Sequence, residues 1–271
     1  MVVRNEGRHL RETLASILGQ RYPGSLEAVV AVGPSDDETL GVAESVAAED
    51  PRLRVVLNPT GRTPTGLNAA LAATSAPIVA RADGHALLPA GYLRRAVEML
   101  DETGAVNVGG VMAAEGTTPF ERAVAAAMSS PFGVGGGRFH YGGDPGPADT
   151  VYLGVFRRQA LIDADGYDER FTRAQDWELN HRLRQAGGTV WFVPDLRTTY
   201  RPRHNLTALA RQYRDYGRWR RVVMREHSDS VRWTYLAPPT TVLGLAAGVG
   251  LAAAGRRIGL LAPAAYAAAN L

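Results

Sequence analysis

The 271-residue chain contains no cysteine and no lysine, and these two absences exclude several kinds of chemistry. Without cysteine there are no disulfides, thiolate nucleophiles or zinc–thiolate sites. All 30 basic residues are arginine, so a Schiff base on lysine and a P-loop lysine are excluded as well. No secretory signal peptide opens the sequence, because Met1-Val2-Val3 is followed at once by Arg4-Asn5-Glu6. We therefore expect the main domain to lie in the cytosol.

Charge is missing from a long stretch near the C-terminus. Residues 233–255 are uncharged, enough for a helix of about 34 Å at ~1.5 Å per residue. Arg256-Arg257 interrupts the stretch, and residues 258–271 are again uncharged but too few to span a bilayer. We expect residues 231–271 to be a membrane-associated hydrophobic segment, either truncated at its end or lying in the membrane interface. The alternative is a buried pair of hydrophobic helices.

Apolar runs of two kinds alternate along residues 1–230. Short continuous runs predict strands, and runs with a helical period predict helices. The expected strands are 27–32, 53–57, 76–82, 105–112, 151–157 and 190–193, and the expected helices are 9–20, 38–48, 65–73, 92–100, 177–185 and 206–225. This alternation predicts an α/β domain with a parallel sheet and helices on both faces. The glycine-rich residues 133–146 lack the strand–loop–helix spacing of a phosphate cradle, so we interpret them as a mobile loop over the active site.

The segment Arg81-Ala82-Asp83-Gly84-His85 follows the apolar run Ile78-Val79-Ala80. Ligands of α/β proteins bind at the C-terminal ends of strands, where this segment is expected. A carboxylate and an imidazole side by side suit a divalent metal, which in turn holds a phosphate. The alternative is an Asp-Gly turn followed by a surface histidine.

Asp176 stands at the start of an expected short helix, in Gln175-Asp176-Trp177-Glu178-Leu179. A carboxylate at this place either caps the exposed amides of the helix or acts as a general base toward an attacking hydroxyl. Glu178 lies two positions further on and cannot face the same way on a helix. It is better suited to hold an acceptor or a structural arginine.

In their order along the chain, these residues resemble a known family. The resemblance rests on Asn5-Glu6, Ser35-Asp36-Asp37, Asn68, Asp83-Gly84-His85, Gln175 to Leu179, and Gln212 to Trp219. Together they are similar to the inverting GT-A glycosyltransferases of family 2, and most similar to membrane-associated enzymes that build exopolysaccharide on a lipid carrier, of the succinoglycan glucosyltransferase type. The resemblance covers about residues 1–225. It implies a GT-A, Rossmann-like, mostly parallel sheet in a domain of residues 1–230.

The resemblance also implies roles for individual residues. Asp83 and His85 fall on the metal-binding Asp-x-Asp motif, with histidine in its last position, and imply Mn²⁺ or Mg²⁺ as a cofactor. Asp176 falls on the catalytic base. The nucleotide sugar is expected to contact Asn5, Glu6, Asp36, Arg62, Asn68 and Asp83. The acceptor or product side is expected to involve Trp177, Glu178, Gln212, Arg218 and Trp219.

Two positions depart from the family's pattern. Where the family has Asp-Asp-Gly-Ser and supplies an acid to the nucleotide base, this chain has Val32-Gly33-Pro34-Ser35. Either Gly33 leaves that contact without a side chain, or Asp36 takes it over. Gln175 replaces the family's glutamate before the base, which removes a like charge beside Asp176.

The expected function is inverting transfer of a sugar from a nucleotide-diphosphate sugar, UDP-linked, to a hydroxyl of a lipid-linked or polysaccharide acceptor. The expected setting is exopolysaccharide or cell-envelope glycan synthesis at the inner or cell membrane, with the catalytic domain on the cytoplasmic side and no nucleic-acid partner. One alternative is a degenerate, membrane-attached sugar-nucleotide-binding subunit. The other is a sugar-nucleotidyltransferase, which needs a glycine-rich N-terminal loop where this chain has only Gly7.

Overall fold

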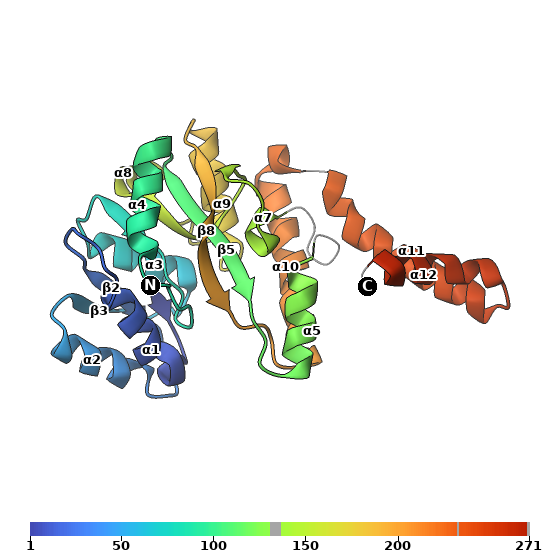
Figure 1. The fold of residues 1–271 in the computed structure, drawn as a ribbon, viewed down its shortest axis with the longest axis horizontal. Helices are drawn as coiled ribbons and strands as arrows, with labels where there is room; N and C mark the ends of the chain where they lie inside the picture. The colour runs from blue at the N-terminus through green and yellow to red at the C-terminus, as the bar shows by residue number, and fades with distance from the viewer. Residues whose placement is uncertain (131–136, 232, 270–271) are drawn as a thin grey trace.

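The computed structural model describes residues 1–130, 137–231 and 233–269, and its N-terminal part alternates strands with helices (Figure 1). The elements are β1 (Val2–Val3), α1 (Gly7–Leu18), β2 (Ala28–Val32), α2 (Thr39–Glu49), β3 (Leu53–Leu57) and α3 (Thr63–Ala72). The three strands form a parallel sheet in the order β1-β2-β3. The expected parallel α/β arrangement is confirmed for this part of the chain.

The second sheet has the order β4-β7-β5-β8-β6. Its strands are β4 (Ile78–Ala80), β5 (Asn107–Ala114), β6 (Gly146–Pro147), β7 (Tyr152–Arg157) and β8 (Val190–Tyr200). Among these described strands, β5 and β8 pair in parallel, while β4–β7, β5–β7 and β6–β8 are antiparallel. The expectation of a mostly parallel sheet is wrong for this half, because β7 inserts between β4 and β5 in the opposite direction. A single parallel bridge between Val2 and Asp83 joins the two sheets.

Helices cover both sides of the sheets, as expected. The side chains of β2 separate into two sets: Val30 and Val32 pack in one hydrophobic cluster with α1, α2 and α4 (Tyr92–Thr103), while Val29 and Ala31 pack against α3. A further cluster joins α3 to α8 (Arg158–Asp163), α9 (Gln175–Gln185) and β7. Helix α9, which carries Asp176, is therefore anchored by the buried Leu179 and Leu183.

The glycine-rich region contains more order than its sequence indicates. Residues 131–136 lie outside the described residues, but α7 (Arg138–Tyr141) and β6 follow directly. Helix α5 (Pro119–Met128), which precedes the region, was not expected either. A capping box between Thr118 and Glu121, with proline in the first turn, starts this helix.

The C-terminal part begins with the long helix α10 (Leu206–Glu226) and continues through η1 (Ser228–Ser230), η2 (Trp233–Leu236), α11 (Ala237–Ala253), η3 (Arg257–Leu260) and α12 (Leu261–Ala269). Figure 1 shows α11 and α12 side by side, projecting from the rest of the chain.

None of the helices in the described ranges is long and apolar enough to cross a membrane. The uncharged stretch does not form one helix of about 34 Å, because α11 begins only at Ala237 and has 17 residues, with proline in its first turn. Proline has no amide hydrogen to bond a preceding turn, so it favours a helix start at this place. The division into residues 1–230 and 231–271 stays a prediction.

Candidate active site

Asp83 and His85 lie in a tight turn directly after β4. Asp83 pairs with β1 through the bridge to Val2, and its carbonyl accepts the amide hydrogen of Ala86 at 3.1 Å. Gly84 between them is pressed against the first strand and α1: a Cβ there would lie 2.9 Å from Val3 Cγ1 and 3.0 Å from Glu6 Cγ. The segment does form an Asp-Gly turn. The same turn places the side chains of Asp83 and His85 against the end of β1, so the turn does not exclude a polar site here.

Arg81 connects Asp83 to Asp176. Its Nη2 lies 2.9 Å from Asp83 Oδ1, and its Nη1 is hydrogen-bonded to Asp176 Oδ1. The Arg81 side chain is only 10% exposed, whereas those of Asp83 and Asp176 are 27% and 39% exposed. A nearly buried guanidinium therefore holds together two carboxylates that lie more than 90 residues apart in the sequence, and both carboxylates remain open to solvent.

Asp176 is in the first turn of α9 but does not cap it. Ala174 is the N-cap residue, with a left-handed backbone at φ 59°, and no side chain caps the helix. A left-handed alanine costs energy, and such conformations gather at functional sites. The capping alternative for Asp176 is therefore wrong, because its carboxylate contacts Arg81 instead of the helix amides.

His85 is held by Glu6. Its Nδ1 lies 2.9 Å from Glu6 Oε1, and this hydrogen bond is the main reason why the pKa of His85 is raised above its usual value. The ring of Tyr200, at the end of β8, lies 6.5 Å from the His85 ring, centroid to centroid. Glu6, expected to contact the nucleotide sugar, orients the histidine in this structure.

The donor set of Asp83 and His85 fits a divalent metal. Within the described part of the chain, Arg81 and Glu6 engage Asp83 Oδ1 and His85 Nδ1, so Oδ2 and Nε2 are the ligand atoms that remain. One hard oxygen and one imidazole nitrogen suit Mn²⁺. A carboxylate on the other ring nitrogen is the usual support of a metal-binding histidine.

Asn5 and Asp36 meet at the ends of β1 and β2. Asn5 Oδ1 accepts a hydrogen bond from the backbone amide of Asp36 at 2.9 Å, and the backbone amide of Asn5 donates to Ser35 Oγ at 3.1 Å. Gly33 is packed tightly here, since a Cβ would lie 3.1 Å from Gly61 Cα. The backbone of Gly61 fills the space that an acid at position 33 needs. Asp36 and Asp37 are both exposed carboxylates of this loop, and that of Asp37 is bonded to Gly7 and Thr39.

Arg62 and Asn68 bind a neighbouring loop rather than this cluster. Asn68 pairs with the backbone of Tyr167 through both its amide oxygen and its nitrogen, at 2.8 Å each. Arg62 Nη2 donates to the carbonyl of Glu169 at 2.6 Å. Both residues thus position the loop before α9. The structure does not bring either one to Asp83.

Of the residues expected on the acceptor side, Glu178 is the most deeply buried. It is 1% exposed, forms a bidentate pair with Arg182 at 2.7 Å, and lies 3.2 Å from His227 Nε2. Glu178 therefore holds a structural arginine, which was one of the two roles expected for it. It is not placed to bind an acceptor, because Arg182 and His227 already engage its carboxylate oxygens.

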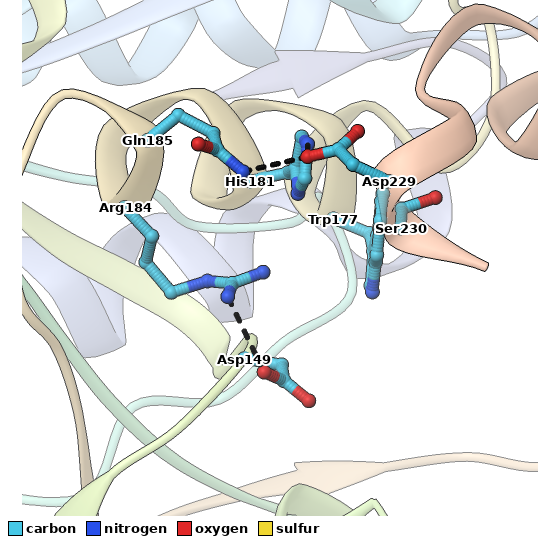
Figure 2. A pocket seen from close by; sticks show the side chains of 7 residues that line it. All are labelled: Asp149, Trp177, His181, Arg184, Gln185, Asp229 and Ser230. Carbon is cyan, nitrogen blue, oxygen red and sulfur yellow. Dashed lines mark hydrogen bonds and ion pairs between the residues drawn. The ribbon is translucent and has the colours of Figure 1, made fainter. Parts of the chain in front are cut away.

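Trp177 lies on yet another side of α9. Its ring stacks on His181 at 5.3 Å, and the Arg220 guanidinium lies 5.2 Å from its centroid. Trp177 lines a cavity together with His181, Asp229 and Ser230 (Figure 2).

The remaining three residues of that set are on α10. Gln212 Nε2 donates to Tyr200 Oη at 3.0 Å and to Tyr216 Oη at 2.8 Å, so it reaches the His85 side of the site through Tyr200. Trp219 packs against Phe171, with ring centroids 6.4 Å apart. Arg218 is exposed.

Two residues of the site, Arg81 and Tyr200, were not among those expected from the sequence. Arg81 is the only charged residue among 78–82 and directly follows β4. A charged residue in such an apolar run is rarely buried without a partner, so this arginine was a usable signal. Burial raises the pKa of the nearby Tyr167 to about 12, which keeps that phenol uncharged beside Arg81 at neutral pH. No sequence signal marks Tyr200 as a neighbour of His85.

The Asp-x-His turn and Asp176, joined by Arg81 at the edge of an α/β sheet, are the arrangement that the resemblance to GT-A glycosyltransferases implies. The sequence matches the family described as "Glycosyltransferase like family 2" over residues 2–220. The chain therefore belongs to this glycosyltransferase family.

Relatives and solved structures agree with this assignment. The succinoglycan biosynthesis protein ExoA of Rhizobium meliloti is 33% identical over 218 residues, which are 80% of this chain and 66% of that protein. Solved structures of two further proteins illustrate the shared fold. TarS 1–349 of S. aureus in complex with UDP-GlcNAc has a TM-score of 0.58 at 18% identity, covering 76% of this chain and 58% of that one. The mannosyltransferase PcManGT of Pyrobaculum calidifontis in complex with GDP-Man and Mn²⁺ has a TM-score of 0.58 at 19% identity, covering 99% and 84%. The chain thus spans just under two thirds of the ExoA length and less of TarS 1–349.

Proposed function

We propose that this protein is an inverting, metal-dependent glycosyltransferase that moves a sugar from a UDP-sugar to a hydroxyl of a lipid-linked or polysaccharide acceptor, in exopolysaccharide or cell-envelope glycan synthesis. The observation that carries the proposal is the Asp83–Arg81–Asp176 arrangement, in which a metal-ligand pair and a candidate base face one another at the end of the sheet. The name of the ExoA relative supports the biosynthetic setting, and the TarS complex supports a UDP-sugar donor. Family membership disfavours the sugar-nucleotidyltransferase alternative.

In the proposed reaction, Asp176 is the general base. Arg81 occupies its Oδ1, which leaves Oδ2 to take the proton of the acceptor hydroxyl. The acceptor oxygen forms a bond to the anomeric carbon while the bond from that carbon to the diphosphate oxygen breaks, and the electron pair leaves with the nucleoside diphosphate. One displacement on the face opposite the leaving group inverts the anomeric configuration.

Asp83 and His85 would hold the metal, with Glu6 orienting the histidine. When bound, a divalent cation offsets the negative charge that develops on the leaving diphosphate. Arg81 holds Asp83 in place from the buried side. The Mn²⁺ in the PcManGT complex supports this part of the proposal.

We further propose that the protein attaches to the surface of the inner or cell membrane, with its catalytic domain on the cytoplasmic side. Five exposed arginines form a stripe on α10: Arg211, Arg214, Arg218, Arg221 and Arg225. At about 100° per residue they lie within an arc of about 80°. Beyond them, α11, η3 and α12 expose large apolar side chains, among them Leu243, Ile258 and Leu261 at 66–68% exposure. A cationic face next to an apolar one suits an anionic lipid surface.

The transfer reaction is tested by incubating the purified protein with labelled UDP- and GDP-sugars, Mn²⁺ and a membrane lipid fraction. Asp176→Asn is expected to lose transfer by at least 100-fold while it keeps binding the donor, as measured by isothermal titration. Asp195→Asn, a change at an exposed carboxylate away from the site, is the matched control. Chelation should abolish transfer, and NMR of the first product should show the inverted anomer.

Transfer by Asp176→Asn at the wild-type rate would contradict the base assignment. Nucleotide binding without any transfer would favour a sugar-nucleotide-binding subunit.

Membrane attachment is tested by co-sedimentation with lipid vesicles. Binding should require anionic phospholipid, and replacing Arg211, Arg218 and Arg225 by glutamine should weaken it by up to about 100-fold, at about 1 kcal/mol per arginine near the surface. Arg94, which is exposed, and Arg95, which is half-buried, lie on α4 outside the stripe, and their glutamine variants are the control. Equal binding to neutral and anionic vesicles would refute the role of the stripe.

A further inference from the structure

A second group of metal-binding side chains lies on the far side of α9 from Asp176. His181, His227 and Asp229 each offer one ligand atom, and these atoms all lie within 4.8 Å of one another. His181 and Asp176 are five positions apart on the helix, which separates them by about 140° around the axis. Asp176 contacts Arg81, whereas the His181 ring stacks on the ring of Trp177. The group is therefore distinct from the Asp83–His85 site.

The distances in this group approach those of a tetrahedral zinc site. His181 Nε2 lies 3.2 Å from Asp229 Oδ2. Zinc ligands at about 2.0–2.1 Å from the ion are about 3.3 Å from each other in a tetrahedron, so this pair already has the required separation. The His227 ring is 4.9 Å from the His181 ring, centroid to centroid, and its ligand nitrogen lies within 4.8 Å of the ligand atoms of His181 and Asp229.

Two of the three side chains, His227 and Asp229, also have support from a further residue. His227 Nε2 lies 3.2 Å from Glu178 Oε1, which leaves Nδ1 for an ion. Gln185 Nε2 donates to Asp229 Oδ2 at 2.6 Å. A carboxylate on the second nitrogen of a ligating histidine and a hydrogen bond to a ligating carboxylate are the usual second layer around a metal.

The cavity beside these residues holds polar atoms that lack partners. It measures about 100 Å³ and is lined by His181, Asp229, Ser230 and Arg184, among others (Figure 2). Ser230 is 92% buried, at 8% relative exposure, and its Oγ has no hydrogen-bond partner among the described residues, nor does Arg184 Nε. A cavity of this size has room for a water, which would complete four-coordination and give the Ser230 hydroxyl a partner.

We propose that His181, His227 and Asp229 bind one Zn²⁺ ion, with a water as the fourth ligand. Two imidazoles and one carboxylate suit zinc better than Mg²⁺ or Ca²⁺, which prefer oxygen ligands. The ion joins η1, after the long helix α10, to the helix that carries Asp176. Its role is to fix the beginning of the C-terminal part against α9.

Zinc binding is measured by competition with a chromophoric chelator, using the full chain with Asp83→Asn and His85→Gln so that only the second site remains. We expect one zinc per chain. Adding His181→Gln should weaken binding by at least 100-fold, and Asp229→Asn by at least 10-fold. His9→Gln, on α1, is the matched control and should change nothing. Zinc at about 100 times its Kd should also raise the Tm by about 5 °C.

Asp229 is 57% exposed, so its substitution by asparagine leaves the core intact and keeps the test valid if His181→Gln does not fold. Cobalt in place of zinc should give the intense visible bands of a tetrahedral site. Zinc binding that is absent, or that is equally tight with and without Asp229 and His181, would overturn the proposal. So would a cobalt spectrum of octahedral type.

Discussion

Replacing Arg81 by methionine removes a nearly buried charge while keeping much of the side-chain volume. Breaking a buried ion pair from one side costs about 3–5 kcal/mol, because the remaining charge is left without a partner. The two carboxylates left behind are 27% and 39% exposed, so water compensates a large part of that cost. We therefore expect the free energy of unfolding to fall by about 2 kcal/mol, which lowers the Tm by about 4–8 °C for a domain of this size.

The same substitution should reduce kcat more than the loss of stability explains. Arg81 fixes the orientation of Asp176 through Oδ1 and separates its charge from that of Asp83. A misplaced general base forfeits part of its usual 10²–10⁴-fold contribution, so we expect kcat to drop by about 10–100-fold. Arg81→Lys should recover part of the stability and less of the rate, since an ammonium cannot bridge two carboxylates as a planar guanidinium does.

Urea unfolding followed by circular dichroism gives the stability, and initial rates of sugar transfer at saturating donor give kcat. Arg94→Met on α4 is the control, because Arg94 is 63% exposed and lies 3.8 Å from its partner Glu98; exposed pairs of this kind contribute about 0–1 kcal/mol. If Arg81→Met matches the wild type in both measurements, Arg81 does not organise the site.

Three further predictions follow from buried or crowded positions. Glu178→Gln should lower stability by about 2–3 kcal/mol, because Arg182 loses its anion, while the KM for the acceptor stays unchanged; a raised KM at unchanged stability would restore an acceptor role. Burial lowers the pKa of His140 to about 4, so the unfolded chain takes up a proton first as the pH falls below about 6.5. Stability should then decrease by about 2 kcal/mol between pH 6.5 and 4, and His140→Phe should lack this component in urea unfolding at a series of pH values. Gly33→Ala should cost about 1–2 kcal/mol in the same assay, because its Cβ meets Gly61 Cα at 3.1 Å; an unchanged midpoint would show that the loop can move aside.

The sequence predicted the positions of most strands and helices because their apolar periods are clear. The helix expected at 206–225 is Leu206–Glu226, and the strand at 53–57 is Leu53–Leu57. Strand direction was not predictable in the same way. The run at 151–157 reads as a buried strand, but nothing in its residues shows that it runs against both neighbours. Direction depends on long-range pairing, which a local pattern does not contain.

For the site, the resemblance to the family predicted that Asp83, His85 and Asp176 act together. Helical geometry alone predicts in which directions the neighbouring residues of α9 point. Successive residues on a helix point about 100° apart, so Asp176, Trp177 and Glu178 face three different directions. The structure agrees: their partners are Arg81, His181 and Arg182, respectively. Assigning all of 176–178 to the reaction was therefore too broad. Gln212 was harder to place, because its partner Tyr200 belongs to a strand that extends further than its apolar run.

Helix α9 thus links the candidate base to the C-terminal part of the chain. Asp176 contacts Arg81 at one end, and within the next turn and a half Glu178 and His181 contact His227 and Asp229. Leu179 and Leu183 anchor the helix in the core, so it moves as a rigid element rather than residue by residue. If the proposed zinc ion holds η1 against α9, we expect its loss to shift η1 and, through α9, the carboxylate of Asp176. This coupling predicts that Asp229→Asn, which touches no part of the Asp83–Arg81–Asp176 cluster, lowers kcat by about 2–10-fold without changing donor affinity, whereas Asp195→Asn changes neither.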